Sequence, residues 1–198
     1  MRDGFAMLDT FIILTGYLLG SVSAAIITSR IMGLPDPRQQ GSGNPGATNV
    51  LRIGGKKAAA LTLAGDLLKG VVPVLLAKAL GLSLEVQLLV ALAAFLGHLY
   101  PVFFGFKGGK GVATALGVLL ALDWRVGLLS LGVWLAVFAW RRVSSLAALG
   151  SATLAPLLIY LVTDSVPFVI FGLVLAALLI WRHRTNIERL LTGEEQKS

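Results

Sequence analysis

Long runs of apolar residues, separated by short polar or glycine-rich breaks, constrain this chain more than any other feature. The apolar segments are residues 8–32, 58–81, 84–104, 111–122, 126–140, 145–162 and 166–181. Most of them approach the roughly 20 residues that a helix needs to cross the hydrocarbon core of a bilayer. With 56% hydrophobic and 14% charged residues, the chain has no stretch left for a large soluble domain. We therefore predict an all-α, polytopic membrane protein with about seven transmembrane helices, forming a single domain over residues 1–198.

Two of the apolar segments need separate comment. The first continues to residue 32, which is too long for the apolar region of a cleavable signal peptide, so we interpret it as a permanent helix. The fourth, 111–122, reaches only about 18 Å as a helix. It either begins within the glycine-rich segment before it or does not cross the bilayer completely.

The basic residues predict the orientation. If the seven helices alternate in direction, all but three of the 17 basic residues fall on one side of the membrane, the exceptions being Arg2, Lys78 and Arg125. Loops rich in lysine and arginine stay in the cytoplasm, so we predict an outward N-terminus and a cytoplasmic C-terminus. The three polar segments with unusual composition then share the cytoplasmic face.

The absence of cysteine excludes several kinds of chemistry. Disulfides, cysteine-ligated zinc and thiolate nucleophiles are all ruled out. The net charge of +7 favours anionic lipid headgroups or anionic substrates as partners. The sequence indicates no metal site, cofactor, nucleic acid or obligate protein partner.

The first polar segment, residues 41–52, has the parts of an oxyanion or phosphate site. Its glycines allow the backbone to approach a ligand, and its hydroxyl, amide and guanidinium groups supply hydrogen-bond donors. The candidate residues are Ser42, Asn44, Thr48, Asn49 and Arg52. The alternative is a polar loop rich in turn residues that only joins two helices.

In the second polar segment, residues 97–114, a glycine-lysine loop leads directly into an apolar helix. The amide groups and the positive end of the helix dipole would then point toward a bound phosphate. The candidates are Lys107, Gly108, Gly109, Lys110 and Thr114. The segment does not match the Walker A pattern, and the alternative is a pair of lysines that bind lipid headgroups. We expect His98 to be a packed, hydrogen-bonded residue.

The third polar segment, residues 181–190, places His183 and Asn186 three positions apart, on one face of a helix. The alternative is a positively charged helix end with an interfacial tryptophan. Within the apolar segments, Asp66 and Lys69 are also three apart, and we predict a salt bridge between them.

Together the three segments resemble the PlsY-type acyl-phosphate:glycerol-3-phosphate acyltransferases of bacteria, over nearly the whole chain. The resemblance rests on Gly-Ser at 20–21, Gly-Ser-Gly-Asn-x-Gly-Ala-Thr-Asn at 41–49, Gly-His-x-x-Pro and Phe-x-Gly-Gly-Lys-Gly-Val-Ala-Thr within 97–114, and His-x-x-Asn-Ile-x-Arg-Leu at 183–190. Two positions depart from the pattern: Ser23 stands where relatives have proline, and Ala148 where they often have a serine.

The resemblance implies transfer of a fatty acyl group from acyl phosphate to glycerol 3-phosphate, giving lysophosphatidic acid and phosphate. By position, the family's functional residues fall on Ser42, Arg52, Lys110, His183 and Asn186, with the backbone of Gly108 and Gly109 lining a phosphate site.

The sequence leaves open which group accepts the proton, which acyl donor is used and whether the protein is an enzyme or a transporter. The His-x-x-x-x-Asp dyad of acyl-CoA acyltransferases is absent, because Phe103 follows five after His98 and Glu188 five after His183. Either His183 is a general base, or the leaving phosphate accepts the proton while the protein positions the substrates. An acyl thioester donor is a further possibility, and the rival function is transport of an organic phosphate.

Overall fold

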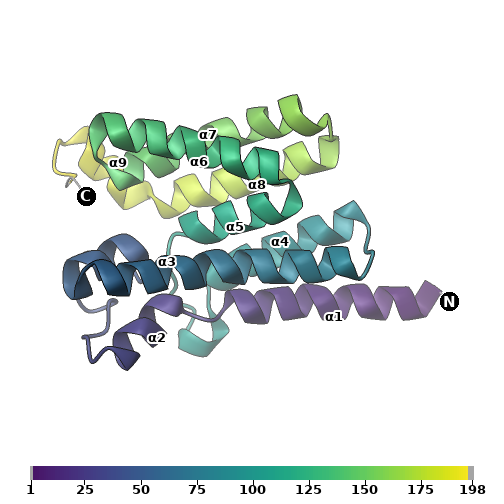
Figure 1. Ribbon diagram of the computed structural model, residues 1–198, viewed down its shortest axis with the longest axis horizontal. Helices are drawn as coiled ribbons and strands as arrows, with labels where there is room; N and C mark the ends of the chain where they lie inside the picture. Colours follow the sequence, from purple (N-terminus) through teal and green to yellow (C-terminus); the bar gives the residue numbers. More distant parts are fainter. Residues whose placement is uncertain (1, 196–198) are drawn as a thin grey trace. The chain divides into compact units, whose positions relative to one another are not determined.

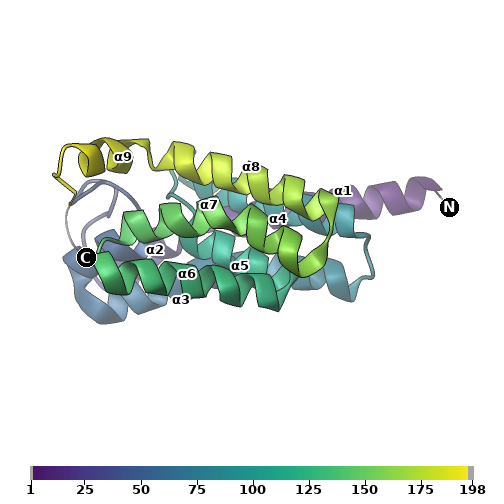
Figure 2. The same cartoon turned by 90° about the horizontal axis from the view of Figure 1, so that it is seen from above.

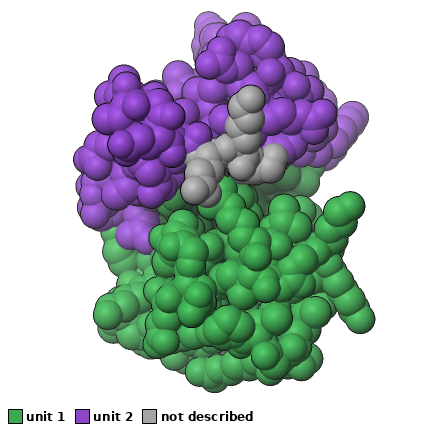
Figure 3. Space-filling model, turned by 90° about the vertical axis from the view of Figure 1, so that its left-hand side faces the viewer, with its two compact units in different colours: residues 1–122 green, residues 123–198 purple. Residues whose placement is uncertain are grey.

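The computed structural model describes the backbone of residues 2–195 and the side chains of residues 6–195. The described residues divide into two compact units, 1–122 and 123–198, which are coloured separately in Figure 3 and are considered one at a time below. The prediction of a single domain stays a prediction. Lys197 and the side chain of Arg2, which both entered the charge count, lie outside the described residues.

Unit 1 is a bundle of helices centred on a long one. Its elements are α1 (Arg2–Gly20), α2 (Ala24–Ile31), α3 (Ala47–Ala79), α4 (Leu84–Leu99), the short 3-10 helix η1 (Val102–Phe104) and α5 (Val112–Leu122). Helix α3 packs against α5, α4, α2 and α1, and α1 also packs along α4. Figure 1 shows α1 in purple running into α2 after a break in the chain.

The break between α1 and α2 bends the first apolar segment by 43°. Ser23 is the N-cap of α2, and its hydroxyl accepts a hydrogen bond from the amide of Ile26 at 3.5 Å. The bend is therefore present although Ser23 replaces the proline of relatives, because an N-cap serine also starts a new helix. The Gly20-Ser21 pair lies where α1 ends and this break begins. A Cβ on Gly20 would collide with the backbone of Ala94, so α1 and α4 cross in backbone contact.

Helix α5 has only 11 residues, and both of its ends are attached to α3. At its start, the hydroxyl of Thr114 donates to the carbonyl of Asp66 at 2.8 Å. At its end, Lys78 Nζ donates to the carbonyl of Leu122 at 2.6 Å. The lysine thus supplies a donor to a helix end whose carbonyl groups have no partner within the helix.

Unit 2 is an antiparallel group of three long helices followed by a short one. Its elements are α6 (Trp124–Arg141), α7 (Ser144–Thr163), α8 (Val166–Arg182) and α9 (Arg184–Leu191). Helix α7 packs against both α6 and α8. Asp123 and Ser165 are the N-caps of α6 and α8, as expected for the short polar connections seen in the sequence. Figure 2 shows α9 continuing from α8 after a sharp bend, which measures 61°.

All seven apolar segments contain helices, which confirms the all-α membrane fold. By length and composition, three described helical stretches can cross a bilayer, Ala47–Ala79, Leu84–Phe104 and Ser144–Thr163, and the two bent pairs bring the number to five. Large apolar side chains such as Phe11, Leu161 and Ile170 are exposed, as lipid-facing residues are. Seven complete crossings stay a prediction.

The first polar segment is only partly a break between helices. The apolar segment 58–81 predicted a helix, but α3 begins already at Ala47 and includes the second half of the polar segment 41–52. Gly55 interrupts the helix with φ 76° and ψ −172°, a conformation open to glycine and strained for other residues. The apolar periodicity starts only after this kink, so the preceding polar turns escaped recognition.

Candidate active site

The first polar segment is held in shape by Asn49. This side chain is 2% exposed, and its amide group donates to the carbonyls of Pro37 at 2.9 Å and Gln40 at 3.0 Å. Its oxygen accepts from the amide of Ser42 at 3.1 Å. Both N–H donors of Asn49 are therefore used to fold the loop that carries Ser42. Direct contact between Asn49 and a substrate stays a prediction.

The second polar segment is attached to the end of α1. Tyr17 donates its hydroxyl to the carbonyl of Tyr100 at 2.7 Å, and Ser21 accepts from the amide of Val102 at 3.4 Å. The hydroxyl of Ser21 itself donates to the carbonyl of Tyr17 at 2.8 Å. Ser21 therefore connects the end of α1 to the turn that precedes the glycine-lysine loop.

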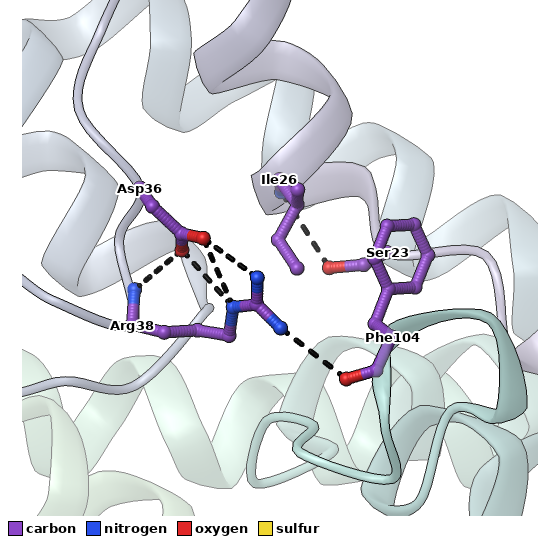
Figure 4. A network of polar contacts seen from close by, with 5 residues as sticks. All are labelled: Ser23, Ile26, Asp36, Arg38 and Phe104. Atoms are coloured by element: carbon purple, nitrogen blue, oxygen red, sulfur yellow. Dashed lines mark hydrogen bonds and ion pairs between the residues drawn. The ribbon is translucent and has the colours of Figure 1, made fainter.

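Arg38, in the loop that precedes the first polar segment, is bonded to the second polar segment, as Figure 4 shows. Its guanidinium donates to the carbonyl of Phe104 at 3.2 Å and forms an ion pair with Asp36 at 2.6 Å. Hydrogen bonds from Arg38 hold the pKa of the Asp36 carboxyl below its ordinary value, although partial burial opposes this. The pair therefore stays charged at neutral pH and keeps Arg38 directed at the second segment.

The glycine-lysine loop packs closely against the end of α4. A Cβ on Gly108 would collide with the carbonyl of His98 and lie 2.6 Å from that of Leu99. A Cβ on Gly109 would collide with His98 Nε2 and lie 3.2 Å from the carbonyl of Pro45. The amide of Gly109 donates to the carbonyl of His98 at 3.2 Å. Glycine is thus required at 108 by the backbone of α4 and at 109 by the His98 ring, and the carbonyl of Pro45 places the first polar segment alongside.

Behind this loop lies a buried polar cluster, composed of Asp66, Lys69, His98 and Thr114. Lys69 Nζ and Asp66 Oδ1 are 2.9 Å apart, which confirms the predicted salt bridge. His98 is 5% exposed, and its Nδ1 lies 2.9 Å from the hydroxyl of Thr114 and 3.6 Å from Asp66 Oδ1. His98 is therefore packed and hydrogen-bonded, as expected, but its nearness to a carboxylate was not foreseen.

The remaining predicted residues of unit 1 have different degrees of exposure. Ser42, Arg52 and Lys107 are exposed, Lys110 is partly buried, and Thr114 is fully buried. Asn44 and Thr48 are half-buried near the start of α3. The structure thus brings the first two polar segments together within unit 1, with several donors accessible. The substrate contacts predicted for these residues stay predictions.

In unit 2, His183 and Asn186 lie on either side of the bend between α8 and α9. His183 is the C-cap of α8 and also the N-cap of α9, so it lies at the bend and not inside one continuous helix with Asn186. His183 Nδ1 lies 2.8 Å from the carbonyl of Leu179. A carbonyl only accepts hydrogen bonds, so Nδ1 carries the proton, and in the neutral ring Nε2 is the acceptor. The side chains of His183 and Asn186 are 2% and 5% exposed.

Glu195 is a residue of this region that the sequence patterns did not indicate. Its Oε1 accepts from Ser145 and from Asn186 Nδ2, both at 2.6 Å, and its Oε2 accepts from Arg189 Nε at 2.8 Å. Gly193 ends α9 with φ 76° and turns the chain back, so that the amide of Glu195 reaches the carbonyl of Arg189. A glycine after a helix is a known stop signal, and it could have indicated this return.

Glu195 is expected to release its partners only in acid. Burial alone raises the pKa of its carboxyl, but hydrogen bonds from Ser145, Asn186 and Arg189 outweigh burial and bring the pKa below the ordinary 4.5. A lowered pKa contributes stability that is complete above the ordinary value and is lost as the pH falls through the folded value. A spin label on a Glu194→Cys variant, in a chain with no other cysteine, should stay immobile down to about pH 5 and become mobile in stronger acid. The same label in a Glu195→Gln background should be mobile at every pH; equal mobility in both backgrounds would contradict the prediction.

Known proteins with similar sequences and structures agree on one family. The family model described as glycerol-3-phosphate acyltransferase matches residues 10–193. The glycerol-3-phosphate acyltransferase of Thioalkalivibrio sulfidiphilus is 62% identical over 191 residues, covering 96% of this chain and 94% of that protein. That of Methylococcus capsulatus is 59% identical over 181 residues, covering 91% of each.

A crystal structure of PlsY, an integral membrane glycerol 3-phosphate acyltransferase, in its glycerol 3-phosphate form has a TM-score of 0.91 and 46% identity. It covers 96% of this chain and 95% of that one. The lysophosphatidic acid form of PlsY has a TM-score of 0.88 and 45% identity, covering 96% and 94%. The polar segments, the helices that carry them and these similarities lead to one assignment: the chain belongs to the glycerol-3-phosphate acyltransferase family.

Proposed function

We propose that this protein transfers a fatty acyl group from acyl phosphate to the primary hydroxyl of glycerol 3-phosphate, releasing lysophosphatidic acid and inorganic phosphate. The observation that carries the proposal is the glycine-lysine loop, whose backbone is packed on His98 beside the first polar segment. Such a loop presents amide groups and a lysine to a phosphate. Both substrates contain a phosphate group, and the product structure of the related PlsY is a lysophosphatidic acid form.

The two units have separate roles in this proposal. In unit 1, Lys110, Ser42 and the amides of Gly108 and Gly109 hold the head of the acyl phosphate, and Arg52 serves one of the two phosphates. In unit 2, His183 and Asn186 orient glycerol 3-phosphate. The fixed tautomer of His183, with Nδ1 bonded to the carbonyl of Leu179, supports Nε2 as the acceptor for a substrate hydroxyl.

The chemistry requires no covalent intermediate on the protein. The hydroxyl oxygen of glycerol 3-phosphate attacks the acyl carbon, the bond from that carbon to the phosphate oxygen breaks, and phosphate leaves. The hydroxyl proton ends on the departing phosphate. The protein contributes orientation, which supplies about 7 to 11 kcal/mol in favourable cases, and each donor to the developing oxyanion contributes about 3 to 4 kcal/mol.

A His183→Ala variant distinguishes orientation from base catalysis. We expect its KM for glycerol 3-phosphate to rise about tenfold or more, because one hydrogen bond to the substrate is lost. Its kcat at saturating substrate should fall by less than about tenfold. Steady-state measurements of phosphate release provide both parameters. Abolished turnover at saturating glycerol 3-phosphate would instead identify His183 as the general base.

The activity itself is tested by incubating the purified protein with acyl phosphate and glycerol 3-phosphate. We expect lysophosphatidic acid and phosphate in equal amounts, also in the presence of a chelator. Formation of neither product would contradict the enzyme and favour phosphate transport. Product formation from acyl-CoA or acyl-carrier protein without acyl phosphate would contradict the proposed donor while leaving the acceptor in place.

We also propose that the protein crosses the bacterial inner membrane with these residues on the cytoplasmic side. The uneven distribution of lysine and arginine supports this orientation. Because the chain has no cysteine, single cysteines at Lys107 and Asp164 can be labelled with an impermeant reagent in intact cells. Labelling is expected at position 164 and not at 107, and the reverse pattern would contradict the orientation.

A further inference from the structure

The hydrogen-bond directions within the buried polar cluster follow from simple donor counting. The hydroxyl of Thr114 has one hydrogen, and it is donated to the carbonyl of Asp66 at 2.8 Å. Toward His98 Nδ1, at 2.9 Å, the hydroxyl oxygen must therefore act as the acceptor. Nδ1 thus carries a proton, and the tautomer and the orientation of the imidazole are fixed.

The cluster is anchored on several elements of unit 1. Lys69 Nζ contacts Asp66 Oδ1 at 2.9 Å and donates to the carbonyl of Val22, in the break between α1 and α2, also at 2.9 Å. Thr114 adds the first turn of α5, and His98 the last turn of α4. Ionisable groups are costly within a membrane-spanning segment unless they have partners. Here each one has a partner, which makes the imidazole a rigid part of the bundle.

The other edge of the imidazole faces the glycine-lysine loop. Its Nε2 occupies the space that a Cβ on Gly109 would need, and the carbonyl of Pro45, in the first polar segment, lies 3.2 Å from the same position. The amide of Gly109 also donates to the backbone carbonyl of His98 at 3.2 Å. The imidazole ring of His98 therefore packs directly against the backbone that precedes Lys110.

We propose that His98 is a positioning residue of the acyl transfer, which sets the conformation of the Gly108–Lys110 backbone and is itself oriented by Thr114, Asp66 and Lys69. This rests on the proposed function, in which that backbone binds a substrate phosphate. Thr114 then acts through His98 and not by touching the substrate. The role differs from proton transfer, because the ring contacts the loop and its Nδ1 proton is engaged within the cluster.

The test uses Thr114→Val, which keeps the shape of the side chain and removes the hydroxyl. We expect the KM for one of the two phosphate substrates to increase about tenfold. This should be the same substrate whose KM rises in Lys110→Ala. The KM for the other substrate and kcat should change by less than about threefold. Thr114→Ser keeps the hydroxyl, so its KM for that substrate should stay within about twofold of the value for the unsubstituted enzyme.

The matched control is Thr62→Val, one turn before Asp66 on the same helix. Thr62 is also fully buried, and its hydroxyl has no hydrogen-bond partner among the residues that the structure describes. The same substitution there should leave all kinetic parameters unchanged. A general packing defect at Thr114 would instead lower kcat, raise both KM values and lower the melting temperature.

A double-mutant cycle with His98→Ala separates indirect from direct action. If Thr114 acts through His98, the double variant is no worse than His98→Ala alone, whereas independent substrate contacts multiply their effects. Multiplied effects, or a Thr114→Val enzyme with unchanged kinetics, would overturn the proposal. If Lys110→Ala changes no kinetic parameter, the proposed phosphate site is wrong. The role of His98 is still decided in that case: it requires that Thr114→Val raises the KM of a single substrate and that its effect does not add to that of His98→Ala.

Discussion

A Gly108→Ala enzyme is expected to lose at least about 100-fold in kcat/KM while remaining folded. The added Cβ would collide with the carbonyl of His98 and lie 2.6 Å from both the carbonyl of Leu99 and Pro101 Cδ. These are backbone and ring atoms that cannot rotate away, so the loop itself must move. A displacement of about 1 Å in a group that positions a substrate costs about 100-fold in rate.

The control for this prediction lies three residues earlier in the same loop. Gly105 has φ 65°, and within the described part of the chain a Cβ there would meet nothing closer than 4 Å. Asparagine tolerates this backbone conformation, so Gly105→Asn should keep kcat/KM within about threefold. Steady-state kinetics in one detergent, with the melting temperature of each variant, test the pair. Equal activity of the two variants would show that the loop does not need its observed conformation.

A Glu195→Ala enzyme is expected to lose about 100-fold in kcat/KM, mainly through a higher KM for glycerol 3-phosphate. The carboxylate accepts hydrogen bonds from Ser145, Asn186 and Arg189. Without it, the amide of Asn186 loses its hydrogen bond to a carboxylate, and the hydroxyl of Ser145 loses the same acceptor. Hydrogen bonds to charged groups contribute about 1.5 to 3 kcal/mol each, which is enough for this loss.

The neighbouring residue provides the control. Glu194 is an exposed carboxylate with the same charge, and Glu194→Ala should keep kcat/KM within about twofold. Glu195→Gln retains one acceptor oxygen and should lose about tenfold. If Glu195→Ala behaves like Glu194→Ala, then Glu195 only attaches the end of the chain and does not orient Asn186.

Much of the helical fold could be predicted because its signals are local. Apolar runs define the helices, and Ser83, Asp123 and Ser165 mark helix starts through capping contacts with nearby amides. The salt bridge between Asp66 and Lys69 was also predictable, since residues three apart meet on one helix face.

The features that were missed depend on contacts between distant residues. His98 meets Thr114 and Asp66 only because α4 and α5 both pack on α3, and no local pattern contains that packing. Glu195 reaches Asn186 through a turn at Gly193, and both Gly193 and Glu195 lie beyond the motif at 183–190. The kink at Gly55 hid the true start of α3, because it separates a polar helical turn from the apolar part.

The attachment of α5 at both ends has a consequence for how the protein tolerates different membranes. With 11 residues, α5 covers about 16 Å, roughly half the hydrocarbon thickness. Because Thr114 and Lys78 tie its two ends to α3, α5 has no need to match the bilayer by itself. The depth of Lys110 is then set by α3, which holds α5, and by the end of α4, on which the glycine-lysine loop packs. A thicker or thinner bilayer would be accommodated by tilting of α3 with its short companion, and the glycine-lysine loop would keep its internal geometry as the lipid composition changes.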